Sequence, residues 1–213
     1  MTSTATEKQI SARLHDETRQ EHEHAETRPF MHELLGGALS LDGYAAYLAQ
    51  FVRIYHALEA RPRQDSDPEM IHDTGLHRAE LMEQDLAALG LNDWETSTTA
   101  LPATEAYVER LQETAAGSWV EHLAHHYVRY LGDLSGGRVI AAMLRRHYDA
   151  QDEQLRFFDF HQVGDHVAYK RRYREELDAL PLSAEEADRV VAESQRAFAF
   201  NSAIFDELES AQA

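Results

Sequence analysis

The segment HHYVRYLGDLSGGRVIAAMLRRHY, residues 125–148, has a helical pattern that three interior glycines interrupt. Each interior glycine costs a helix about 0.5–1 kcal/mol relative to alanine. At roughly 100° per residue, one face of the predicted helix consists of His125, Arg129, Gly132, Gly136, Val139, Ile140 and Met143, with Asp133 at its edge. A backbone stripe without Cβ atoms predicts a helix that lies against a flat, rigid ligand.

Two other interpretations of these glycines stay open from the pattern alone. Gly136 and Gly137 are compatible with the end of one helix, followed by a second helix that begins near Val139. The Gly-x-x-x-Gly spacing of Gly132 and Gly136 equally suits close packing between two helices.

The rest of the chain also predicts helices. Apolar residues recur at i, i+3, i+4 and i+7 from Tyr44 to Leu58 and again from Val190 to Leu208. Ser183 and Glu186 form a capping box before the second of these helices. No stretch shows strand alternation. Turn residues stand at Gly36-Gly37, 61–68, 90–102 and Gly164. We therefore predict an all-α fold, with one domain over residues 1–213 and a core from about residue 8 to residue 209.

Composition limits the possible functions. The formal charge of −18 repels nucleic acid and anionic membrane surfaces. No cysteine is present, so His, Tyr, Met or carboxylate side chains must hold any metal or haem. The N-terminus is polar, and no run of eighteen apolar residues occurs, which predicts neither export nor a membrane anchor. A cytoplasmic protein is compatible with these features.

The run from Tyr127 to Arg138, YVRYLGDLSGGR, resembles the distal-helix signature of the haem oxygenases. Other segments similar to this family follow in the same order from about Leu14 to Phe205. The resemblance implies that haem b, which is both substrate and cofactor, lies between a proximal N-terminal helix and a glycine-bent distal helix. It also implies cleavage of haem, mainly at the α-meso carbon, to biliverdin, CO and ferrous iron. The reaction uses O2 and electrons from an NAD(P)H-dependent reductase or a ferredoxin, and one role for such an enzyme is iron acquisition.

The segment LHDETRQEHEHAETRPFM, residues 14–31, resembles the first helix of that family. On this match His22 is the axial iron ligand, and Glu26 is its partner one turn away. Spacing alone does not select His22 among 13 histidines. Helical geometry places one polar face at His15, Thr18, Arg19, His22 and Glu26, and a solvated face would have the same composition.

On the distal side, the resemblance assigns proton delivery to Asp133, which anchors a network of ordered water. Tyr55 and Arg129 match positions attached to this network, and Gly132 and Gly136 match the bare backbone. A plain ion pair between Arg129 and Asp133, at i and i+4, is compatible with the same residues.

The segment from Tyr169 to Arg174 resembles the stretch that holds the haem propionates, with Lys170 and Arg174 as the cations. A solvated basic run is the alternative. His15 stands where relatives commonly have a further propionate-binding lysine, and Arg138 stands where glutamine is frequent. Other matched pocket positions are Thr18, Tyr127, Gly137, Phe200 and Asn201, although Phe200 equally suits an ordinary helix core.

Two rival hypotheses remain. A helical oxygenase with a carboxylate-bridged metal pair needs Glu-x-x-His motifs, and Glu21/His24 and Glu69/His72 match this pattern. Chance alone predicts about one such match in this composition. A haem carrier would share the His22 pocket but lack the distal acid, so Asp133 favours catalysis.

Overall fold

The computed structural model describes residues 8–212, and within this range the chain forms helices joined by turns and loops, without a strand. The α-helices are α1 (Ile10–Glu17), α2 (Arg19–Glu26), α3 (Pro29–Gly36), α4 (Leu41–Glu59), α5 (Ala79–Ala88), α6 (Trp94–Ser97), α7 (Pro102–Ala116), α8 (Trp119–His126), α9 (Gly132–Tyr148), α10 (His166–Asp178) and α11 (Ala184–Gln212). Short 3-10 turns are η1 (Glu69–His72), η2 (Thr74–Leu76), η4 (Asp152–Gln154), η5 (Arg156–Phe158) and η6 (His161–Val163). A π-helical turn, η3 (Tyr127–Leu131), joins α8 to α9. The all-α prediction is confirmed.

Helix α4 lies at the centre of the core. Thirteen of its nineteen residues are buried, because α4 packs against α5, α7, α8 and α11. Ser40 caps its first turn by accepting a hydrogen bond from the backbone N–H of Asp42. The helix predicted from Tyr44 to Leu58 is therefore present and extends slightly beyond both ends.

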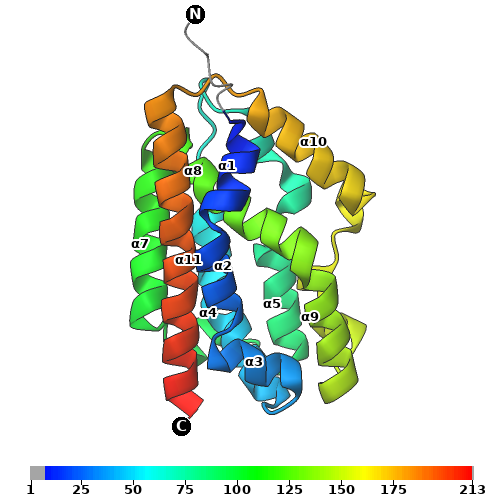
Figure 1. Cartoon of the computed structure of the whole chain (residues 1–213). Coiled ribbons are helices and arrows are strands. Elements are labelled where there is room, and N and C mark those ends of the chain that lie inside the picture. The colour runs from blue at the N-terminus through cyan, green and yellow to red at the C-terminus, as the bar shows by residue number, and fades with distance from the viewer. Residues whose placement is uncertain (1–7, 213) are drawn as a thin grey trace, which may run out of the picture.

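Helix α11 runs along the length of the molecule, with α2 beside it (Figure 1). It begins at the predicted capping box, in which Ser183 and Glu186 exchange side-chain hydrogen bonds with each other's backbone N–H. Nε2 of Gln195 donates to the carbonyl of Glu17 over 2.8 Å. The C-terminal helix therefore holds the N-terminal helices in place.

The segment 125–148 is helical throughout, so Gly136 and Gly137 do not end a helix. The predicted common face is wrong for its first two residues, however, because His125 and Arg129 are both buried. The π turn η3 inserts one additional residue into the helical path and rotates the preceding residues by about 100° relative to an α-helix. His125 is consequently fully buried, whereas Gly132 is exposed. The run also changes direction between α8 and the end of α9 (Figure 1).

The N-terminal helix is interrupted at Thr18, where the resemblance implied one continuous helix. The Thr18 hydroxyl donates to the carbonyl of Leu14 over 2.7 Å and competes with the helical hydrogen bonds. Of the eight residues of α2, only Ala25 is buried.

The turn predicted at Gly36-Gly37 is present at the end of α3. Gly37 ends α3 with φ 82°, a left-handed conformation that glycine adopts without a Cβ clash. No helix in the described range is both long enough and apolar enough to cross a membrane.

We predict that acid weakens the fold through three buried histidines of α8: His122, His125 and His126. Burial lowers the pKa of all three, to about 3 for His122. The unfolded chain, with a histidine pKa of about 6.5, therefore binds more protons than the folded protein below this pH. The stability that these groups contribute is present above pH 6.5 and is lost as the pH falls toward the folded value. For His122 the loss at pH 5 is about 2 kcal/mol.

Urea unfolding at about pH 7.5 and about pH 5 measures this loss. His122→Asn removes one of the three groups, so the difference between the two pH values should shrink by about 2 kcal/mol. An equal difference in the variant and the unmodified protein would contradict the role of His122.

Candidate active site

A cavity of about 200 Å³ lies between α1 and α2 on one side and η3 and α9 on the other. Helix α11 contributes Phe198 to it, and α10 contributes Arg174. The residues that line the cavity are His15, Thr18, Arg19, His22, Tyr127, Val128, Leu131, Gly132, Ser135, Arg174 and Phe198. Segments distant in the sequence thus bring imidazole, apolar and cationic side chains together.

His22 of α2 has two neighbouring side chains in this cavity. Its Nδ1 lies 3.4 Å from Oε2 of Glu26, and its ring meets Phe198 edge-on with 5.5 Å between the ring centroids. The carboxylate of Glu26 can only accept, so it favours the tautomer in which Nδ1 carries the hydrogen and Nε2 has a lone pair for a metal. The side chain is 46% exposed, so a ligand can reach it.

Gly132 forms part of the facing wall, at the start of α9. A Cβ built on Gly132 or Gly136 would meet no atom within 4 Å, so neither glycine serves close packing between helices. Val128 and Leu131 flank Gly132 and supply apolar surface. The wall therefore suits a flat apolar ligand that approaches the backbone.

Beneath this wall, the guanidinium of Arg129 is buried in a hydrogen-bond network. It donates from Nη1 to Oδ1 of Asn201 over 2.8 Å, and from Nε to the Tyr55 hydroxyl over 3.2 Å. Its Nη2 lies 3.5 Å from Oδ1 of Asp133, and the Tyr55 hydroxyl donates to the other oxygen of that carboxylate. Phe51 covers the cation, with its ring centroid 4.8 Å from the guanidinium carbon. Both oxygens of Asp133 are therefore anchored.

Asp133 lies on the buried side of α9, one residue after Gly132, and does not itself line the cavity. Burial raises the pKa of its carboxyl, while Arg129 and the Tyr55 hydroxyl act against this rise. A carboxyl whose pKa is raised in a fixed position can hold a proton near the cavity wall.

Cations of α10 lie at the rim of the cavity. Nζ of Lys170 donates to Oγ of Ser135 over 3.1 Å, and Arg174 lines the cavity. Burial and the charge of Arg174 lower the pKa of Lys170. Among residues 8–211, no carboxylate forms an ion pair with either cation. An anionic ligand would therefore supply the partner that both cations lack.

A family model with the description Heme oxygenase matches residues 8–207. The chain belongs to the haem oxygenase family. Heme oxygenase 1 of Nostoc sp. is 33% identical over 204 residues, which are 94% of this chain and 86% of that relative. Heme oxygenase 1 of Homo sapiens is 32% identical over 206 residues, which are 94% of this chain and 72% of that relative.

Solved haem oxygenase structures share the fold. The crystal structure of heme oxygenase-1 from Synechocystis sp. in complex with heme has a TM-score of 0.89 at 30% identity, over 95% of this chain and 93% of that chain. The structure of heme oxygenase from Leptospira interrogans has a TM-score of 0.88 at 29% identity, over 94% of this chain and 100% of that chain. The predicted family and fold are confirmed.

Most of the site residues expected of a haem oxygenase lie in or around the cavity. Those that line it are His15, Thr18, His22, Tyr127, Gly132 and Arg174. Glu26 and Lys170 contact lining residues, and Gly136 faces open space one turn after Gly132. The remaining distal residues form the buried network, and they are Asp133, Arg129, Tyr55 and Asn201.

Two predicted pocket residues lie elsewhere. Gly137 faces Phe158, whose Cδ1 would be 3.1 Å from a Cβ at this position, because five residues turn an α-helix about 140° away from Gly132. Phe200 stacks on Tyr107 with 4.8 Å between the ring centroids. Phe198, about 200° around α11 from Phe200, faces the cavity in its place.

Sequence reasoning did not assign five of the lining residues to the site, and these are Arg19, Val128, Leu131, Ser135 and Phe198. Arg19 lies on the predicted polar face of the first helix, and this position could have indicated that it lines the cavity. No sequence signal identifies Phe198, because the pattern of apolar residues in a packed helix is the same whether a residue faces a ligand or the core.

We predict opposite effects of one substitution at two glycines of α9. Gly132→Ala places a methyl group in open space, so the free energy of unfolding should rise by about 0.5–1 kcal/mol. Gly137→Ala brings its Cβ within 3.1 Å of the Phe158 ring, so displacement of that ring should cancel or reverse the gain. Chemical denaturation of the ligand-free protein measures both. Equal stabilisation by the two substitutions would show that Gly137 does not pack on Phe158.

Proposed function

We propose that the protein is a haem oxygenase, which binds haem between α2 and the η3–α9 segment with His22 as the axial iron ligand. The observation that best supports this function is the cavity, where the imidazole of His22, beside Glu26, lies across from the bare backbone at Gly132. The proposed reaction consumes haem b, O2 and reducing equivalents and yields biliverdin, CO and ferrous iron.

The side chains present fit haem. Nε2 of His22 suits iron, the apolar residues around Gly132 suit the macrocycle, and Lys170 and Arg174 suit the two propionates. His15 is 77% exposed at the rim and lies 2.8 Å from Asp16, so it is a weaker propionate partner than a lysine. At about 200 Å³ the cavity is below the roughly 300–1,000 Å³ of ordinary ligand pockets, so we expect its walls to separate as haem enters.

Each protein group has a distinct part in the reaction. Haem, when bound, supplies the oxygen chemistry at its iron. Nε2 of His22 would hold the iron, and the bare backbone at Gly132 would leave room for O2. Arg129 and Tyr55 position the carboxyl of Asp133, and this carboxyl delivers protons to the distal side of the cavity. Lys170 and Arg174 fix the rotation of the ring, which directs cleavage mainly to the α-meso carbon.

The finer biological assignments belong to the same proposal. The electron donor is an NAD(P)H-dependent reductase or a ferredoxin, and an acidic donor would be attracted by the basic residues Lys170, Arg171, Arg172 and Arg174 of α10, beside the cavity. Arg145 and Arg146 form a separate basic pair at the C-terminal end of α9, where Arg145 pairs with Asp152. We expect the protein to act in the cytoplasm, where the ferrous product could serve iron acquisition.

Incubation of the purified protein with haem, ascorbate and O2 tests the function. We expect the Soret band to disappear and a biliverdin spectrum to form, and chromatography should show mainly the α isomer because Lys170 and Arg174 orient the ring. A haem spectrum that persists under these conditions would indicate a carrier. A predominantly β or δ bilin would show that other residues hold the propionates.

His22→Ala should retain partial haem affinity through the apolar lining but lose the histidine-ligated spectrum and turnover. Added imidazole should restore part of both. His24→Ala is the matched control, because His24 lies on the same short helix and does not line the cavity. A wild-type spectrum in His22→Ala, or the loss of ligation in His24→Ala, would assign the iron to another histidine.

A further inference from the structure

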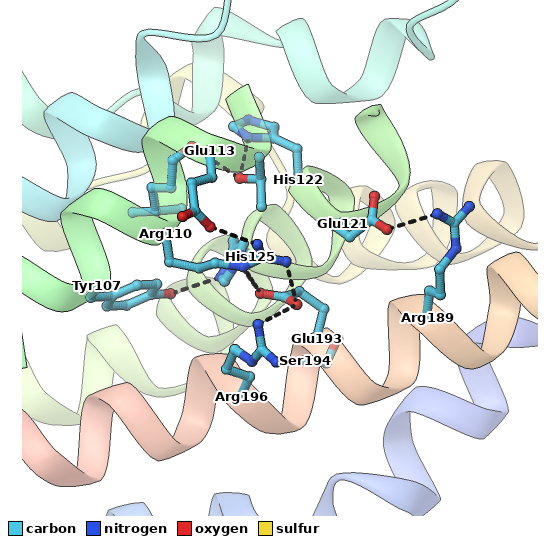
Figure 2. A network of polar contacts seen from close by, with 12 residues as sticks. Tyr107, Arg110, Glu113, Glu121, His122, His125, Arg189, Glu193, Ser194 and Arg196 are labelled. Carbon is cyan, nitrogen blue, oxygen red and sulfur yellow. Dashed lines mark hydrogen bonds and ion pairs between the residues drawn. The ribbon is translucent and has the colours of Figure 1, made fainter. Parts of the chain in front are cut away.

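A second buried polar network joins α7, α8 and α11, and Glu193 lies at its centre (Figure 2). Oε1 of Glu193 accepts from Nε of Arg110 over 2.8 Å and lies 2.9 Å from Nε2 of His125. Its Oε2 accepts from Nη2 of Arg110 over 2.9 Å. Burial alone would raise the pKa of Glu193, but the hydrogen bonds from His125 and Arg110 lower it to about 2. Glu193 is therefore ionised at neutral pH.

The ionised Glu193 decides which nitrogen of His125 carries the hydrogen. A carboxylate can only accept, so Nε2 must be the donor. Burial lowers the pKa of His125 and outweighs the opposing effect of Glu193, so the ring is neutral and Nδ1 is an acceptor. Nδ1 lies 3.3 Å from the hydroxyl of Tyr107. Tyr107 therefore donates its hydrogen to His125, and its oxygen lone pairs point away from the imidazole.

Two connections lead from this network to the one around Arg129. Along the chain, His125 precedes Arg129 by four residues across the π turn η3. On α11, Phe200 stacks on the ring of Tyr107 and the next residue, Asn201, accepts from Arg129. The charge of Arg129 also opposes the rise in the pKa of the Tyr107 phenol that burial causes.

We propose that Glu193 and His125 are positioning residues for the distal site: they hold the ring of Tyr107, on which Phe200 stacks, and thereby keep the neighbouring Asn201, its partner Arg129 and the Asp133 carboxyl in place. The catalytic meaning of this inference rests on the proposed haem oxygenase function. Its structural part applies equally to the protein without haem.

Charged and titratable groups surround both Asp133 and His125. Asp133 is faced by Tyr47 and Tyr55 of α4, Arg78 before α5, Tyr107 of α7, and Arg129 and Tyr130 of η3. His125 is faced by Tyr107 and Arg110 of α7, His122 of α8, and Glu193 and Arg196 of α11. Tyr107 contacts both His125 and Phe200, so we expect a change at His125 to reach Asn201, Arg129 and Asp133 through Tyr107 and α11.

Two substitutions separate the two hydrogen bonds of His125. His125→Asn places a carbonyl where Nδ1 stands and keeps the acceptor for Tyr107, whereas His125→Gln places its amide where Nε2 stands and keeps only the contact with Glu193. We expect the ¹³C titration midpoint of Asp133 in ligand-free protein to shift by about 0.5 pH unit or more in His125→Gln. In His125→Asn it should stay close to that of the unmodified protein.

Arg189→Gln is the matched control, because it breaks a surface ion pair of 2.9 Å with Glu121 between the same two helices, α11 and α8. It should leave the Asp133 titration unchanged. Glu193→Gln is a second route to the same effect, since an amide no longer restricts Nε2 of His125 to the role of donor. It should shift the midpoint and alter the ¹⁵N spectrum of the His125 ring.

In the haem-loaded enzyme, His125→Gln should slow bilin formation about tenfold and alter its pH profile, and His125→Asn should restore most of the rate. An unchanged Asp133 titration in His125→Gln and Glu193→Gln, or a ¹⁵N spectrum with the hydrogen on Nδ1 in the unmodified protein, overturns the inference. A shifted titration in a protein that degrades no haem supports the positioning role and instead refutes the proposed function.

Discussion

Burial of the Arg129 guanidinium constrains the centre of this protein. A cation removed from water is tolerated only when its donors are paired, and the partners come from three separate helices: Tyr55 on α4, Asp133 on α9 and Asn201 on α11. These helices must pack in the arrangement that satisfies the cation, and the same arrangement exposes Gly132 at the cavity. The core and the distal site of this haem oxygenase family member therefore depend on the same contacts.

Helix α11 links the two walls of the cavity. Its Phe198 contacts His22 on one side, while its Asn201 and Glu193 reach the buried groups behind the other side. A rigid helix that contacts both walls sets the distance between them. Residues far from any ligand, such as Gln195 on the Glu17 carbonyl, therefore belong to the geometry of the site.

The sequence predicted those parts of the structure that local patterns decide. Burial of an apolar stripe fixes α4, and the Ser183 cap fixes the start of α11. The π turn η3 could not be predicted, because one inserted residue alters the direction of side chains and not their composition, so His125 turns away from Gly132. Segment resemblance pointed to helices that line the cavity but not to every lining residue, as Phe198 on α11 shows. The Glu193 network could not be predicted either, because its residues come from three helices that are distant in the sequence and meet only in the folded protein.

Helix α2 buries only Ala25 among its eight residues, so it contributes little to the cooperative stability of the fold. A segment with so few buried contacts opens at a free energy well below that of global unfolding. A ligand in the cavity would add the apolar contact that α2 lacks. Ligand binding would therefore raise the free energy needed to open that helix. We expect a protease to meet an open α2 more often in molecules without ligand. The lifetime of the protein would then depend on the supply of the molecule that it consumes.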